Sequence, residues 1–177
     1  MRPVTSRAAT YRRTATPARL RQRERSHNGR TLTLDAIDHL LGEKPVDPAA
    51  ASALRTLHEY GIELLVASNT TPGEKRWPAL QQAGIDGLFR VALLSYPLGV
   101  RKPAPLFYEL VLAAAGCPAS QVLFVGDNFA CDVAGPVAHG MQAVLVRPRG
   151  LRLGEELPDG VPLISHFREL PALLEAR

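Results

Sequence analysis

Apolar runs that end in polar residues constrain the fold of this chain more than any other feature. Residues 62–67 form a nearly continuous apolar run that leads to Ser68 and Asn69, and residues 122–125 form a second run that leads to Asp127. Strands that are apolar on both faces are typical of the centre of a parallel sheet covered on both sides. The runs therefore predict a buried parallel sheet with polar groups at one edge.

Segments with helical spacing of apolar residues alternate with these runs. The pattern predicts an α/β fold, a Rossmann-like three-layer sandwich with a mainly parallel sheet joined by right-handed crossovers. Asp47 is expected to cap the first helix ahead of Pro48. The sequence has no GxGxxG motif to support dinucleotide binding. The expected helices cover residues 48–60, 73–83, 105–115, 131–139 and 167–175, and the further strands cover 91–94, 143–146 and 162–164.

A change of composition near residue 30 divides the chain. Residues 1–30 carry nine arginines against one acid, Glu24, without apolar periodicity, so we expect a basic disordered tail. Its interpretation stays open between a solvated tail, a translation artefact or wrongly chosen start, a transit peptide, and an arm for nucleic acid or another acidic partner. The net charge is +4 for the whole chain but −4 for residues 31–177, so this part of the chain is not expected to bind nucleic acid.

The remaining composition narrows the protein class. The chain has 177 residues, of which 46% are hydrophobic, and no apolar run approaches the roughly 20 residues needed to cross a bilayer. Its two cysteines, Cys117 and Cys131, form neither a disulfide framework nor a CxxC pair. We therefore expect a single-domain cytoplasmic protein without a membrane partner.

The candidate site combines a hydroxyl, an ammonium group and two carboxylates. Ligands of open α/β sheets bind beyond the carboxyl ends of the strands, where the sequence places Ser68, Lys102, Asp127 and Asp132. A hydroxyl can hold phosphate oxygens, a lysine can offset their charge, and carboxylates suit Mg²⁺. The alternatives are that Ser68 caps a helix, that Lys102 is a solvated loop residue, and that both aspartates are turn or helix-start residues.

Three motifs in order resemble those of the haloacid dehalogenase (HAD) superfamily. Residues 65–69, LVASN, resemble motif II, and Lys102-Pro103 with Phe107 resembles motif III. Residues 125–132, VGDNFACD, resemble motif IV. Each motif alone is weak, but three in the right order at strand ends are specific. The resemblance covers about residues 45–177, so we interpret 47–177 as a HAD-like core.

The resemblance implies roles for the candidate residues. Ser68 and Asn69 would bind the substrate, a small phosphorylated molecule. Lys102 would be the catalytic lysine that neutralises the phosphoryl group and positions the nucleophile. Asp127 and Asp132 would form the Mg²⁺ site, with Asp132 supporting either the metal or the lysine.

The family's first motif, an apolar strand that ends in DxD, has no clear counterpart. The nearest segment contains Asp35, but Ile37 stands where the family has its second acid, and Asp38 comes one position late. Leucines and Ile37 with helical spacing lead us to interpret residues 31–46 as a helical remnant, of a cap in one interpretation. The central nucleophile strand is then expected to be missing, with residues 32–34 as the only segment able to fill part of its place.

Two functions follow from this interpretation. The first is a HAD-like hydrolase, a Mg²⁺-dependent phosphomonoester hydrolase by ancestry, which lacks its nucleophile and is expected to be inactive. The second is a non-catalytic protein that binds or regulates through a phosphate pocket. The metal-independent dehalogenase branch is less favoured, because Lys102 and the two aspartates are retained. The substrate, the cap type and the oligomeric state stay open.

Overall fold

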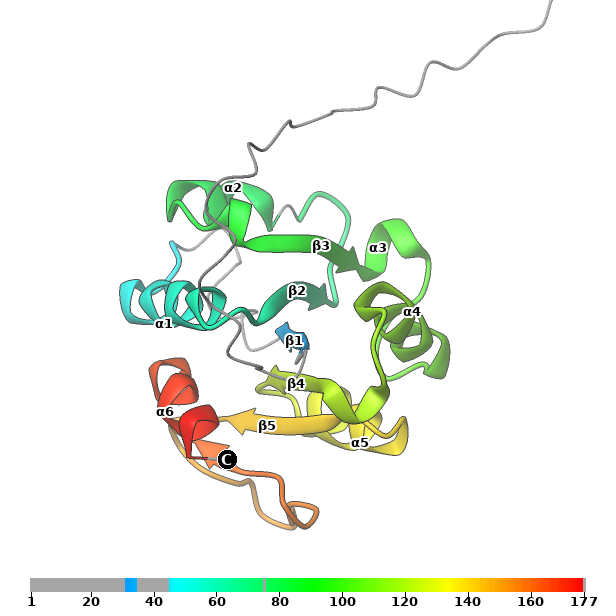
Figure 1. Cartoon of the computed structure of the whole chain (residues 1–177). Helices are drawn as coiled ribbons and strands as arrows, with labels where there is room; N and C mark the ends of the chain where they lie inside the picture. The colour runs from blue at the N-terminus through cyan, green and yellow to red at the C-terminus, as the bar shows by residue number, and fades with distance from the viewer. Residues whose placement is uncertain (1–30, 35–44, 75, 177) are drawn as a thin grey trace, which may run out of the picture.

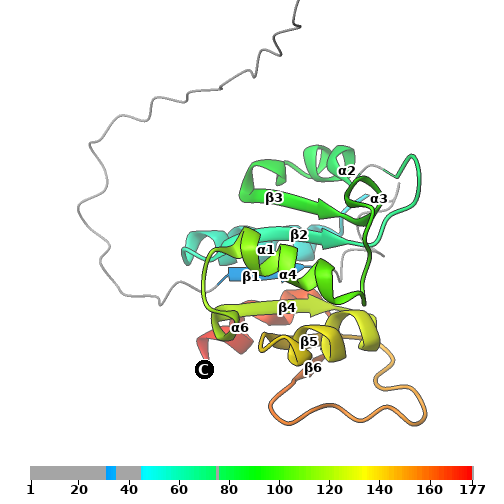
Figure 2. The ribbon, with the colours of Figure 1, turned by 90° about the vertical axis from the view of Figure 1, so that its right-hand side faces the viewer.

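The computed structural model describes residues 31–34, 45–74 and 76–176. Six parallel strands form one sheet in the order β3-β2-β1-β4-β5-β6 (Figure 2). The strands are β1 Thr31–Leu34, β2 Glu63–Ser68, β3 Phe89–Leu94, β4 Val122–Gly126, β5 Gln142–Val146 and β6 Leu163–Ile164. The α/β fold with a parallel sheet, expected from the sequence, is confirmed.

Helices cover both faces of the sheet. In Figure 1, α1, α2 and α6 lie on one side of the strands and α3, α4 and α5 lie on the other, which gives three layers. The α-helices are α1 Pro48–Glu59, α2 Trp77–Gln82, α3 Ser95–Leu98, α4 Pro105–Ala115, α5 Gly135–Ala138 and α6 Leu170–Glu175. Shorter helical segments are η1 Asp86–Leu88, η2 Ala119–Gln121, the π-helix η3 Phe129–Ala134 and η4 Phe167–Glu169.

The alternation of side chains along β2 explains the two layers of core. Leu64 and Val66 pack in the cluster that includes residues of α1, α2 and α6. Leu65 and Ala67 pack in the cluster that includes residues of α4. All four are fully buried, as expected for a strand with apolar residues on both faces.

Helix α1 begins where the sequence predicts. The Asp47 carboxylate accepts hydrogen bonds from the backbone N–H groups of Ala49 and Ala50, both at 2.9 Å, and Pro48 occupies the first turn. The cap satisfies two N–H groups that have no partner within the helix. Helix α1 thus leads into β2, which carries the first candidate site residue.

The expectation of an empty place at the sheet centre is corrected. Strand β1 lies between β2 and β4, with Leu34 in register with Val66 on one side and Val125 on the other. The helix predicted from residue 31 is therefore wrong for residues 31–34. Two β-branched threonines alternate with leucines there, a short pattern that fits a strand. Residues 35–44 of the predicted helix and the basic tail 1–30 lie outside the described residues.

Candidate phosphoryl-binding site

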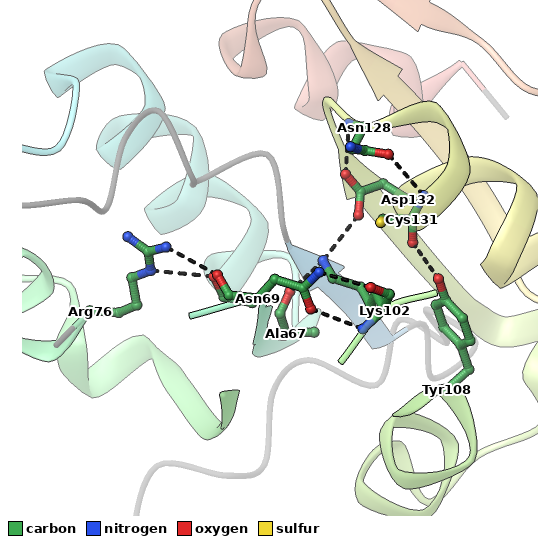
Figure 3. Close-up of polar contacts among 9 residues, drawn as sticks. Ala67, Asn69, Arg76, Lys102, Tyr108, Asn128, Cys131 and Asp132 are labelled. Atoms are coloured by element: carbon green, nitrogen blue, oxygen red, sulfur yellow. Dashed lines mark hydrogen bonds and ion pairs between the residues drawn. The ribbon is translucent and has the colours of Figure 1, made fainter. Parts of the chain in front are cut away.

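The candidate residues lie at the carboxyl edge of the sheet. Ser68 is the last residue of β2, and Asp127 follows the last residue of β4. Lys102 lies in the loop between α3 and α4, and Asp132 lies in η3. Figure 3 shows Lys102 and Asp132 pointing toward each other beside Ala67.

Lys102 and Asp132 form a buried ion pair. The Lys102 Nζ atom lies 3.0 Å from Asp132 Oδ1 and donates a second hydrogen bond to the Ala67 carbonyl at 3.1 Å. Both charged side chains are fully buried. The rings of Phe107 and Phe124 lie with their centroids 5.9 and 5.2 Å from Nζ. Burial lowers the pKa of the Lys102 ammonium, and the Asp132 carboxylate opposes that shift.

Asn69 holds the backbone of Lys102. Its Nδ2 donates to the Lys102 carbonyl and its Oδ1 accepts from the Lys102 N–H, both at 2.9 Å. These two bonds connect the end of β2 to the lysine loop, and Figure 3 shows them side by side. The sequence predicts that Asn69 binds substrate, and that role stays a prediction. The structure adds a positioning role that the sequence did not indicate.

Asp132 also organises the turn after β4. Its Oδ2 accepts a hydrogen bond from the Asn128 N–H at 2.8 Å, and the Asp132 N–H donates to the Asn128 carbonyl at 2.7 Å. The side chain reaches back over Gly126, where an added Cβ would lie only 2.2 Å from Asp132 Cγ. A residue without a side chain is therefore required at position 126. The phenol of Tyr108 donates a hydrogen bond to the Cys131 carbonyl at 2.7 Å. This bond stabilises η3, the segment that contains Asp132.

Asp127 is held through its backbone. The buried guanidinium of Arg147, directly after β5, donates from Nε to the Asp127 carbonyl at 2.7 Å. Arg147 also pairs with the carboxylate of Glu155, and this contact holds the pKa of Glu155 below its usual range. The partly exposed Asp127 lies close enough to Lys102 to raise the pKa of the ammonium, although less than Asp132 does.

The hydrogen bonds of Asp132 fit a supporting role better than direct contact with Mg²⁺. Both Asp132 oxygens accept hydrogen bonds, one from Lys102 and one from Asn128. Within the described ranges, no three His, Cys, Asp or Glu side chains gather around one point. Mg²⁺ keeps most of its water ligands and often takes only one or two carboxylates with a substrate phosphate. The metal role predicted for Asp127 stays a prediction.

One arginine enters the site without a sequence signal. Arg76, at the start of α2, is buried and donates from Nε to Ser68 Oγ at 3.3 Å. No sequence pattern marks Arg76, because it follows a polar segment and matches none of the three motifs. Asp35, the residue after β1 in the sequence, lies outside the described residues.

Comparison with known proteins now identifies the family. The sequence pattern of the haloacid dehalogenase-like hydrolases matches residues 8–140. The chain belongs to this family. The phosphoglycolate phosphatase of Pseudomonas fluorescens Pf-5 is 35% identical over 134 residues, which cover 73% of this chain and 48% of that protein. Haloacetate dehalogenase H-2 of Moraxella sp. strain B is 32% identical over 129 residues, 71% of this chain and 57% of its own length.

A solved structure of the family supports the same assignment. The HAD phosphatase from Thermococcus onnurineus has a TM-score of 0.63 and 26% identity, over 73% of this chain and 58% of that one. This chain spans about half the length of the curated phosphatases it matches. No helix in the described part of the chain has the length and apolar character needed to span a membrane.

Proposed function

We propose that this HAD-like protein binds the phosphoryl group of a small, cytoplasmic phosphorylated molecule at the carboxyl edge of its sheet. The observation that carries the proposal is the buried Lys102–Asp132 pair next to the end of β2. Burying a lysine costs free energy unless its ammonium is paired and hydrogen-bonded. The Lys102 ammonium contacts a carboxylate and a carbonyl, and the Asn69 side chain makes two hydrogen bonds with the Lys102 backbone. Buried charged groups of this kind are typical of functional sites.

Each residue has a role in this proposal. The Ser68 hydroxyl would donate to a phosphoryl oxygen, and Lys102 would offset the negative charge. Asp127 would hold Mg²⁺, which when bound would neutralise charge on the phosphoryl oxygens. Asp132 would act as the support of both, because it pairs with Lys102 and fixes the turn that carries Asp127.

Catalysis depends on a residue outside the described ranges. Strand β1 occupies the place of the family's nucleophile strand, and the sequence continues with Asp35. By the family resemblance, hydrolysis would begin with attack of an aspartate on phosphorus and departure of the alcohol, followed by water attack on the aspartyl-phosphate. Ile37 stands where the family has its second acid, which protonates the leaving group. We therefore propose binding with at most very slow turnover.

An aryl phosphate assay with Mg²⁺ tests the catalytic part. We expect release far below an ordinary enzyme rate, because loss of general acid catalysis alone typically costs 10²- to 10⁴-fold. Turnover near 1 s⁻¹ that Asp35→Asn abolishes would contradict this expectation and identify Asp35 as the nucleophile. Binding of phosphate without turnover is the expected result, and it agrees with a non-catalytic protein that binds or regulates through a phosphate pocket.

Calorimetric titration tests the metal and the anion separately. We expect weak Mg²⁺ binding that Asp127→Ala removes, because one carboxylate without a phosphate holds this ion poorly. Micromolar binding that survives the substitution would place the cation elsewhere. Inorganic phosphate should bind the parent protein and fail to bind Lys102→Met. A parent protein that does not bind phosphate would refute the proposed function.

A further inference from the structure

Tyr108 lies in α4, and its side chain is fully buried. Its ring packs edge-on against the rings of Phe107 and Phe124, with centroid distances of 6.2 and 6.1 Å. The same two rings lie beside the Lys102 ammonium. A buried phenol usually finds a hydrogen-bond partner, and Figure 3 shows the Tyr108 hydroxyl bonded to the Cys131 carbonyl. A residue of α4 therefore reaches η3, the segment that carries the aspartate of the buried ion pair.

The Tyr108 hydroxyl acts on the peptide unit directly before Asp132. The carbonyl of this unit belongs to Cys131 and accepts from Tyr108 at 2.7 Å. The N–H of the same unit belongs to Asp132 and donates to the Asn128 carbonyl, also at 2.7 Å. Because a peptide unit is planar, hydrogen bonds at both of its ends fix its orientation. That orientation sets the direction in which the Asp132 side chain leaves the backbone, and its carboxylate lies 3.0 Å from Lys102 Nζ.

Gly135 leaves the space that the phenol occupies. A Cβ added at this position would lie 2.0 Å from Tyr108 Oη, far closer than van der Waals contact. The ring of His139 packs on the Tyr108 ring with the centroids 4.8 Å apart, and its Nδ1 lies 2.7 Å from the Gly135 carbonyl. A carbonyl oxygen can only accept, so Nδ1 carries the hydrogen in this bond. The segment after η3 thus holds the Tyr108 hydroxyl against the Cys131 carbonyl.

We propose that Tyr108 is a positioning residue for phosphoryl binding, whose hydroxyl fixes the peptide unit before Asp132 and so holds the Asp132 carboxylate against Lys102. The inference rests on the proposed function and adds to it a residue that acts through Asp132 rather than by contact with the ligand. Groups that bind a ligand need neighbours that hold them in place. A shifted carboxylate would leave the buried ammonium less well placed, and phosphate affinity would fall.

Calorimetric titration with inorganic phosphate tests the proposal. Tyr108→Phe removes one oxygen and keeps the ring, and we expect it to weaken phosphate binding by about 3- to 10-fold, the size of one neutral hydrogen bond. Tyr60→Phe is the matched control, because it removes a phenol that donates to the Glu175 carboxylate. Tyr60 precedes the amino end of β2, opposite to the site, so its loss should change phosphate affinity by less than about twofold.

The amide proton of Asn128 reports the position of the Asp132 carboxylate without any ligand. The Asn128 N–H donates to Asp132 Oδ2 at 2.8 Å, and such a charge-assisted bond moves an amide proton to high chemical shift. We expect this signal to move to lower shift in Tyr108→Phe and to stay in place in Tyr60→Phe. A general loss of stability would not move the signal of the folded protein, so an unmoved signal in Tyr108→Phe would show that the inference is wrong.

A double variant shows whether Tyr108 acts through Asp132. With Asp132→Asn already present, Tyr108→Phe should lower phosphate affinity by less than about twofold. If the two losses in affinity multiply instead, Tyr108 does not act through this carboxylate and the inference is overturned. If Asp132→Asn binds phosphate too weakly to titrate, the Asn128 signal decides.

The outcomes distinguish this inference from the proposed function. If the parent protein binds phosphate and Tyr108→Phe binds it equally well, the inference fails and the proposed function stands. If the parent does not bind phosphate, the proposed function fails and this inference fails with it. If circular dichroism shows that Tyr108→Phe is unfolded, a protein with para-aminophenylalanine at position 108 decides, because its amine keeps a donor in the place of the hydroxyl. Phosphate affinity and an Asn128 signal like those of the parent support the inference, and loss of either overturns it.

Discussion

The buried pair of Lys102 and Asp132 should dominate the stability of the site. In Lys102→Met the side chain keeps its length but loses the ammonium, so a fully buried carboxylate retains only the Asn128 N–H. Breaking a buried ion pair from one side costs about 3 to 5 kcal/mol. For a chain of this size each kcal/mol lowers the melting temperature by about 2 to 4 °C, so we expect a decrease of about 6 to 20 °C.

A double-mutant cycle shows whether the cost comes from the pair. Asp132→Asn removes the negative charge and keeps an oxygen that can accept from Asn128. With both substitutions, no unpaired charge stays buried, so the double variant should be more stable than the sum of the single losses predicts, by about 1.5 to 3 kcal/mol. Urea unfolding at pH 7 measures all four proteins.

The same urea unfolding experiment includes a control variant. Arg55→Gln, a surface substitution, should change the free energy of unfolding by no more than about 0.5 kcal/mol. If the losses for Lys102→Met and Asp132→Asn add to within about 0.5 kcal/mol, the two charges do not stabilise each other. The account of the site as a coupled pair would then be wrong.

Two further substitutions probe the turn after β4. Gly126→Ala should displace Asp132, lower the melting temperature and weaken phosphate binding, whereas Gly87→Ala, where an added Cβ meets no atom within 4 Å, should leave phosphate binding unchanged. Burial raises the pKa of Tyr108 above its usual value near 10, so above pH 10 the unfolded chain loses a proton that the folded protein keeps. Stability should therefore fall as pH rises above 10, by up to about 1.4 kcal/mol per pH unit from this group. Unfolding curves of Tyr108→Phe should show a smaller decrease over the same pH range, and an identical decrease would contradict the assignment.

The sequence was sufficient where buried strands and helix caps determine local structure. Residues 62–67 and 122–125 were predicted as strands from continuous apolar character, and Asp47 was predicted as a cap. It was insufficient for β1, because four alternating residues carry little periodicity and the leucines that follow fit a helix equally well. What makes residues 31–34 a strand is pairing with β2 and β4, a tertiary effect that local pattern cannot show.

For the candidate site, too, local sequence patterns could be interpreted and contacts between distant elements could not. Ser68, Lys102, Asp127 and Asp132 could be predicted as candidates because each follows an apolar run or matches a motif, and their roles stay predictions. The partners of these residues were not found, because Arg76 and Arg147 reach the site through contacts between elements. Asp132 lies in a π-helix from Phe129 to Ala134, whose turn is wider than that of an α-helix, and no sequence pattern indicated this kind of helix.

The position of β1 has a consequence for how the protein is made. During synthesis β1 and β2 emerge early, but β4, the other neighbour of β1, emerges only after α4. Until then the inner edge of β1 is an open edge strand, able to pair with another chain. Contacts between strands so distant in sequence also slow folding. The pairing of β1 with β4 should thus form only after β4 has emerged, and nascent chains that stop before residue 122 should aggregate more readily than those that extend beyond residue 126.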